Sequence, residues 1–113
     1  MAHKVFLEGM DLYLGLDQDG TQKFNEALEY DNEFSLAYIM LARQYAVNGS
    51  PDKSETNLNL AKKFSEKSSK REQGLINLID LMLDKNDKAI HFAKQHIEEY
   101  PNDVMALSQL LGP

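Results

Sequence analysis

A set of side chains that returns after 34 or 35 residues constrains the fold of this chain more than any other feature. Phe24 and Leu58 are 34 residues apart, and Leu41 and Ile76 are 35 residues apart. Between these positions the apolar residues recur at intervals of three and four, which is the period of an amphipathic helix. A single helical bundle has no reason to repeat at this distance, whereas a stack of helix pairs does. The sequence therefore predicts an all-α fold built from tandem helix pairs.

Residues that start and stop helices divide the chain into seven expected helices and no strand. Asn48-Gly49 is typical of a helix C-terminus, and Ser50-Pro51 is typical of the start of the next helix. Ser69-x-x-Glu72 has the spacing of a capping box, and Asn86 is expected to cap the sixth helix. The fifth helix is apolar almost all round, which predicts burial on most sides. The expected helices cover about residues 4–16, 21–30, 34–47, 51–67, 70–84 and 87–100, with a seventh after Pro101.

The middle of the chain carries the most specific pattern. Tyr38-x-x-Leu41-Ala42-x-x-Tyr45 falls on the third expected helix, and Ser54, Leu58 and Ala61 fall on the fourth. This layout resembles the tetratricopeptide repeat, a helix–turn–helix unit of about 34 residues with small residues where two helices approach closely. The resemblance implies a right-handed α-solenoid of about three antiparallel helix pairs plus a C-terminal helix, in a single domain. The implied repeats cover about residues 1-33, 34-68 and 69-101, and the closing helix covers 102-111.

The third repeat departs from this pattern, because Asp80 falls at the place of a Tyr and His96 at the place of a small residue.

A narrower resemblance covers the C-terminal half of the chain. Lys70-Arg71-Glu72-Gln73, Lys88-Ala89 and Tyr100-Pro101-x-Asp103-x-x-Ala106-Leu107 are similar to the family of tetratricopeptide repeat protein 38. Members of that family are longer than this chain, so the resemblance implies an N-terminal portion of a larger protein.

The composition narrows the class of protein. The 113 residues fit one domain, and a hydrophobic fraction of 42% is enough for a core. A net charge of −6 repels phosphate groups, so nucleic acid is not expected as a partner. The sequence has no cysteine, no N-terminal signal segment and no apolar run long enough to span a bilayer. These features favour a soluble, cytoplasmic protein that does not enter a membrane.

Two groups of residues have part of a metal-binding pattern. Asp17-x-Asp19-Gly20 followed by Glu26 is similar to a calcium loop, but Gly15 stands where that loop needs its first carboxylate. His91 and His96 are five residues apart, which is not the spacing that places two ligands on one helix face. We therefore expect no metal, no cofactor and no catalytic residue, with His91 facing solvent and His96 packed or half-buried.

A run of basic residues joins the fourth and fifth expected helices, and it comprises Lys62, Lys63, Lys67, Lys70 and Arg71. The first interpretation is a solvated face, because cations near a helix C-terminus complement the helix dipole. The second is a binding site for an acidic peptide or an acidic neighbour.

The candidate binding surface is the face of each pair's first helix that turns away from its packing partner. In such arrays the first helices line a concave surface, and exposed apolar patches usually mark interfaces. We therefore expect a non-enzymatic protein–protein interaction module whose apolar groove binds a peptide or helix, with Arg43 adding a charge-assisted contact. The alternatives are self-association, as a homodimer or against a missing C-terminal part, and an accessory domain of an enzyme. The predicted groove residues are Phe6, Met10, Tyr13, Leu36, Ile39, Met40, Arg43, Val47, Leu78 and Met82.

Overall fold

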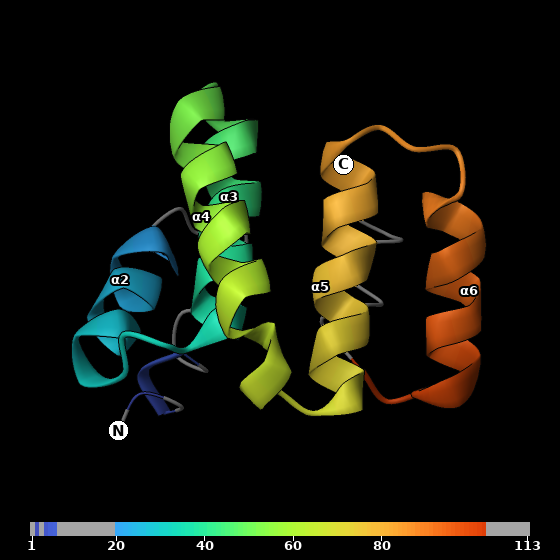
Figure 1. The fold of residues 1–113 in the computed structure, drawn as a ribbon, viewed down its shortest axis with the longest axis horizontal. Helices are drawn as coiled ribbons and strands as arrows, with labels where there is room; N and C mark the ends of the chain where they lie inside the picture. The colour runs from blue at the N-terminus through green and yellow to red at the C-terminus, as the bar shows by residue number, and fades with distance from the viewer. Residues whose placement is uncertain (1, 3, 7–19, 104–113) are drawn as a thin grey trace. The chain divides into compact units, whose positions relative to one another are not determined.

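The computed structural model describes residues 2, 4–6 and 20–103, and all of the regular secondary structure in these ranges is helical. The expected all-α fold is thus confirmed for this part of the chain, while the seventh expected helix and most of the first lie outside it. The chain divides into two compact units, Met1–Phe64 and Ser65–Pro113. The helices are α2 (Gly20–Tyr30), α3 (Ser35–Val47), α4 (Pro51–Phe64), the short 3-10 helix η1 (Ser65–Lys67), α5 (Lys70–Leu83) and α6 (Ala89–Glu99) (Figure 1).

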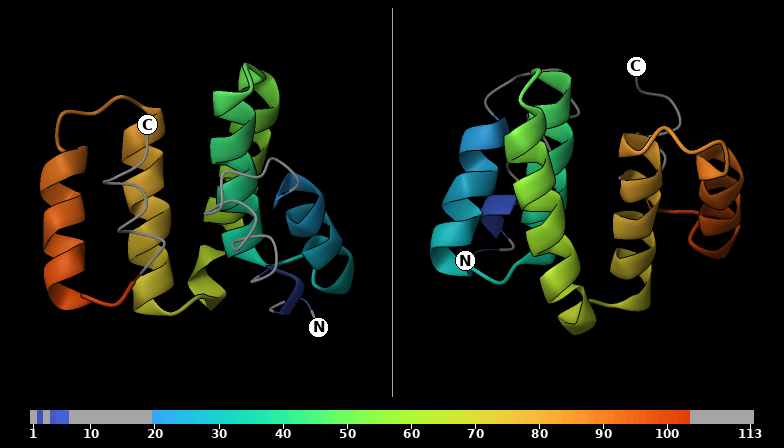
Figure 2. Two further views of the ribbon diagram at one scale, coloured as in Figure 1. Left: turned by 180° about the vertical axis from the view of Figure 1, so that it is seen from behind. Right: turned by 45° about the horizontal axis from the view of Figure 1, so that its top comes forward.

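The first unit is organised around α3, which packs against both α2 and α4 (Figure 2). Leu41 and Ala42 are buried as the repeat pattern predicts, and the Ser54 hydroxyl of α4 donates a 2.7 Å hydrogen bond to the Ala42 carbonyl. This short bond brings the backbones of α3 and α4 close together at a small residue. The buried residues of α3 lie on more than one side of the helix, and they are Ser35, Leu36, Ala37, Ile39, Met40, Leu41, Ala42 and Arg43.

Three phenylalanines connect the start of the chain to this core. The ring of Phe6 lies 5.3 Å from that of Phe24 on α2 and 5.1 Å from that of Phe34, which precedes α3. Both contacts are tilted, which is a favourable arrangement of aromatic rings at this separation. Phe6 and Phe24 are almost completely buried. Val5 and Phe6 are therefore part of the core of the first unit.

The first helix of each long hairpin, α3 in one and α5 in the other, ends in the same hydrogen-bonded motif. At the end of α3, Ser50 N–H donates to the Tyr45 carbonyl and Gly49 N–H to the Ala46 carbonyl, which is the Schellman motif. Gly49 has a φ of 80°, as its predicted role at a helix C-terminus requires. The end of α5 repeats these bonds, but Lys85 occupies the left-handed position with a φ of 54°.

The second unit is a hairpin of α5 and α6 (Figure 1). As predicted, α5 is buried on most sides: Leu75, Ile76, Leu78 and Ile79 are buried, and Asn77 is its only exposed residue between Arg71 and Leu83. The expected capping box opens the helix. None of the described helices combines the length and the apolar character needed to cross a membrane.

The start of α6 differs from the sequence prediction. The helix begins at Ala89 rather than near Asp87, and Lys88 rather than Asn86 occupies the cap position. The Asn86 side chain instead accepts a 2.9 Å hydrogen bond from the Lys88 backbone, which closes an Asx turn. Asn and Asp side chains compete for nearby backbone donors, so a turn and a helix cap have the same sequence signal.

Candidate functional site

Most of the predicted groove residues lie inside their units. Six of them are buried, Val47 is 66% exposed, Met82 is half-exposed, and Met10 and Tyr13 lie outside the described residues. The helical periodicity predicted that one face of α3 packs and that the opposite face is open. In the structure α3 has neighbours on more than one side, so the opposite face is covered too. Partner binding at these positions stays a prediction. The buried six are Phe6, Leu36, Ile39, Met40, Arg43 and Leu78.

Among the described residues, two large apolar side chains outside the predicted groove also face solvent. Tyr30 at the end of α2 is 53% exposed, and Ile90 in the first turn of α6 is 63% exposed. Together with Val47, both lie in the first or last turn of their helices.

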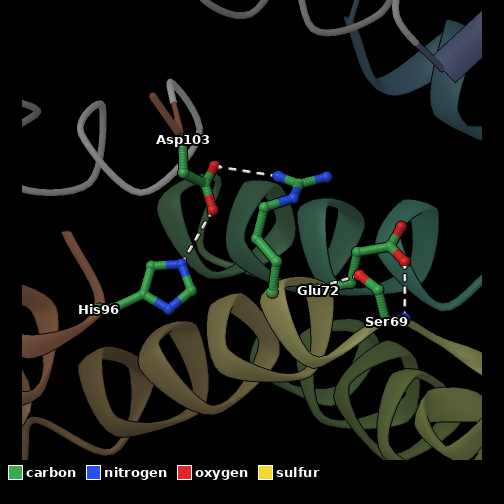
Figure 3. A network of polar contacts seen from close by, with 5 residues as sticks. Ser69, Glu72, His96 and Asp103 are labelled. Atoms are coloured by element: carbon green, nitrogen blue, oxygen red, sulfur yellow. Dashed lines mark hydrogen bonds and ion pairs between the residues drawn. The ribbon is translucent and has the colours of Figure 1, made fainter. Parts of the chain in front are cut away.

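A cluster of ionisable groups lies where α6 ends and α5 begins, and the sequence prediction did not include it. Asp103 is 4% exposed, and its Oδ2 lies 2.9 Å from Nε2 of His96, the buried histidine in the last turn of α6 (Figure 3). The other oxygen, Oδ1, lies 3.3 Å from Nη1 of Arg71 in the first turn of α5. A carboxylate only accepts hydrogen bonds, so Nε2 of His96 carries the hydrogen. The cluster satisfies a carboxylate whose burial without partners would be costly.

Local structure places each member of the cluster. Ser69 accepts a hydrogen bond from the Glu72 backbone and Glu72 accepts one from the Ser69 backbone, so the capping box fixes the first turn of α5 that carries Arg71 (Figure 3). At the other end, Tyr100 N–H donates to the His96 carbonyl and Asp103 N–H to the Tyr100 carbonyl. This tight turn brings Asp103 back over His96.

His96 fits because α5 has a glycine opposite it. A Cβ added to Gly74 would lie 2.6 Å from Nδ1 and 2.8 Å from Cε1 of His96, which is closer than real side chains approach. The positions 35 residues earlier carry Ile39 and Ala61, both buried. The α3–α4 hairpin therefore has a large residue, Ile39, on its first helix and a small one, Ala61, on its second. The α5–α6 hairpin has the small Gly74 on its first helix and the large His96 on its second. The departure of His96 from the repeat pattern is thus matched by a reduction in volume at Gly74.

Two tyrosines near charged groups have altered acidity. Desolvation raises the pKa of Tyr100, the charge and hydrogen bond of Glu99 add to that rise, and Arg71 opposes it. The ring of Tyr100 lies 5.0 Å from that of His96. In the first unit, burial raises the pKa of Tyr38, and the charge of Asp31 raises it further.

The Arg71–Asp103–His96 cluster is suited to holding helices together. Its carboxylate is engaged by groups from two helices, and the hydroxyl of the nearby Ser69 is occupied by the cap. Within the described ranges, no three His, Cys, Asp or Glu side chains are grouped to hold a metal ion. His91 is exposed and His96 is buried, as the sequence predicted. Sequence reasoning had two signals for the cluster, a histidine at a small-residue position and an aspartate after Pro101.

Comparisons of the chain with family models, with curated proteins and with solved structures find no match. The likeness to the tetratricopeptide repeat therefore rests on the pattern of residues in this chain.

Proposed function

We propose that this chain is a non-enzymatic protein–protein interaction module of the tetratricopeptide-repeat type, a short right-handed α-solenoid that holds a segment of another polypeptide. In repeat arrays of this kind, each helix pair packs on its neighbours and the stack presents an extended surface to a partner. A module of rigid helix pairs does not need to become ordered when a partner binds, so little of the binding free energy is lost to that ordering.

The observation that carries this proposal is the burial of the repeat positions. Ala27, Ala61 and His96 follow one another at 34 and 35 residues and are all buried. Ser54 and Ala89, which are 35 residues apart, are buried as well. The sequence period and the burial pattern thus agree, which supports a tandem array of helix pairs more than an unrelated bundle.

Site-specific photo-crosslinking of the full chain tests the proposal. A photoreactive residue is placed at Val47, Asn77 or Ile90, which are exposed, and at Thr56 on the exposed side of α4 for comparison. In extract of the cells that make the protein, we expect a discrete adduct at some of these positions and not at others, abolished by excess unlabelled protein. Equal background at every exposed position would refute an interaction role.

Self-association is the second candidate, and the exposure of Val47 and Ile90 favours it. Light scattering after size exclusion, over a concentration series, separates the two functions. A mass near 12.9 kDa throughout leaves the surface available to another protein. A mass that rises toward twice that value with concentration assigns the surface to a second copy.

A further inference from the structure

Asn48 and Gly49 are both exposed, at the turn between α3 and α4. We infer that this dipeptide is a site of covalent self-modification, at which Asn48 is converted to aspartate and isoaspartate through a cyclic imide formed with the Gly49 nitrogen. Water is the only co-reactant. The inference goes beyond the proposed function, because it concerns a chemical change of the chain itself and needs no partner.

The reaction is an intramolecular attack on the Asn48 side-chain amide. The Gly49 nitrogen gives its proton to solvent and forms a bond to Cγ of Asn48, while the bond from Cγ to Nδ2 breaks and the amide nitrogen leaves as ammonia. Water then opens the five-membered ring. Opening at Cγ gives aspartate, and opening at the Asn48 backbone carbonyl gives isoaspartate, in which the main chain runs through Cγ. Each product contains a carboxylate in place of the amide, and nothing is oxidised or reduced.

The glycine that follows Asn48 distinguishes it from the other asparagines of the chain. Asn48 is the only asparagine in the sequence that precedes a glycine, and each of the others precedes Glu, Leu or Asp. A side chain on the following residue crowds the nitrogen as it approaches Cγ, and glycine has none. Apart from the two neighbouring residues, no atom lies within 4 Å of the place that a Cβ on Gly49 would occupy. The surroundings of the attacking nitrogen are therefore open.

The backbone holds the Gly49 nitrogen by a long hydrogen bond. Gly49 N–H donates to the Ala46 carbonyl across 3.3 Å, which exceeds the usual range of about 2.7–3.2 Å. Ring closure requires this bond to open, and bonds in exposed turns open at a lower free-energy cost than those in a core. The opening of the Schellman motif at the end of α3 therefore controls the rate of the reaction in the folded protein.

The other described asparagines are held more firmly. The N–H groups that follow Asn32 and Asn102 donate bonds of ordinary length, 3.0 Å to an Asp31 carboxylate oxygen and 3.1 Å to the Tyr100 carbonyl. The Asn86 side chain is fixed in its Asx turn. The remaining asparagines lie inside helices, where the following N–H belongs to the helical hydrogen-bond ladder, and they are Asn25, Asn57, Asn59 and Asn77.

The modification acts on the α3–α4 hairpin. It places a carboxylate at the C-terminus of α3, where the helix dipole disfavours negative charge. Isoaspartate also lengthens the main chain by one CH₂ group inside the Schellman motif, so the bonds from Gly49 and Ser50 to α3 lose their geometry. The reaction thus alters the surface beside Val47, which is 66% exposed.

Peptide mapping of the full chain after incubation at mildly alkaline pH tests the inference. Trypsin releases residues 44–53, in which Asn48 is the only asparagine, so a gain in mass and a split into two chromatographic forms report on this site alone. We expect product at Asn48 before any at Asn32, Asn86 or Asn102, with isoaspartate identified by an isoaspartyl methyltransferase. Gly49→Ala should lower the rate about tenfold or more, which corresponds to about 1.4 kcal/mol in the barrier.

Three results would overturn the inference. One is earlier reaction at another asparagine, and another is aspartate without isoaspartate at position 48, which indicates direct hydrolysis of the side chain. The third is an equal rate for Gly49→Ala. Because alanine strains this turn, the variant and the parent chain are also compared when fully unfolded in urea, where only the crowding at the nitrogen distinguishes them. Equal rates there refute the role of Gly49 whatever happens in the folded protein.

Discussion

We expect the effect of Gly74→Ala on the stability of the protein to depend on the residue opposite, which is His96. In a helix interior, alanine is more favourable than glycine by about 1 kcal/mol. Here the added Cβ would lie 2.6 Å from Nδ1 of His96, so the ring must retreat. The ring cannot retreat freely, because Asp103 holds Nε2 at 2.9 Å. Overpacking of this kind costs about 1–3 kcal/mol, so Gly74→Ala should be neutral or destabilising by up to about 2 kcal/mol.

Removing the imidazole should reverse this result. In a His96→Ala background the space beside Gly74 is open, and Gly74→Ala should then stabilise the protein by about 1 kcal/mol. Urea unfolding of the four proteins, followed by far-UV circular dichroism, gives the coupling energy from a double-mutant cycle. We expect a coupling of about 1–3 kcal/mol.

Gly49→Ala provides the matched control. Gly49 has a φ of 80° and no atom within 4 Å of an added Cβ, so alanine there is strained by backbone conformation alone. It should cost about 1 kcal/mol in both backgrounds and show no coupling to His96→Ala. Stabilisation by Gly74→Ala in the presence of His96, or a coupling below about 0.5 kcal/mol, would refute the steric argument.

Three further variants test contacts within the two units, and urea unfolding measures their stability. Ser54→Ala should destabilise the protein by about 1 kcal/mol through loss of a buried 2.7 Å hydrogen bond, whereas Thr56→Ala, whose hydroxyl bond is exposed, should change stability by less than about 0.5 kcal/mol. Ser69→Ala should cost about 1 kcal/mol by removing the cap of α5, and Ser69→Asp, which can still cap, should not. Burial, and then the charge of Asp31, raise the pKa of Tyr38, so the folded protein keeps this proton where the unfolded chain loses it. The contribution of this raised pKa to the free energy of unfolding is present below pH about 10 and lost at higher pH. Tyr38→Phe should therefore reduce the loss of stability at alkaline pH, and an unchanged pH profile would contradict this.

The end of α3 and the starts of α4 and α5 follow from local signals that the sequence contains, whereas the start of α6 was predicted wrongly. Gly49 tolerates a positive φ, Pro51 fits the first turn of a helix, and Ser69 caps the helix that Glu72 continues. Each of these effects involves residues close together in the chain, so no tertiary information is needed. The burial of Ala61 at the repeat spacing is predictable for the same reason, because a helical period marks the packing face.

The candidate site depends on contacts that the sequence does not specify. His96 and Asp103 are seven residues apart, and their pairing depends on a tight turn that folds the chain back and on a glycine in another helix. Lys85 adopts a left-handed conformation that its residue type disfavours, so the hairpin must supply the energy that holds it there.

The sequence by itself determined an all-α chain of helix pairs, with their approximate ends and the small residues at their contacts. Only the tertiary structure decided which apolar faces remain exposed. Met40 and Arg43 lie on the face predicted to be open, but α3 has neighbours on more than one side, so both are buried. The physical reason is that periodicity reports which residues share a helix face, whereas the number of neighbours around that helix decides whether the face meets water.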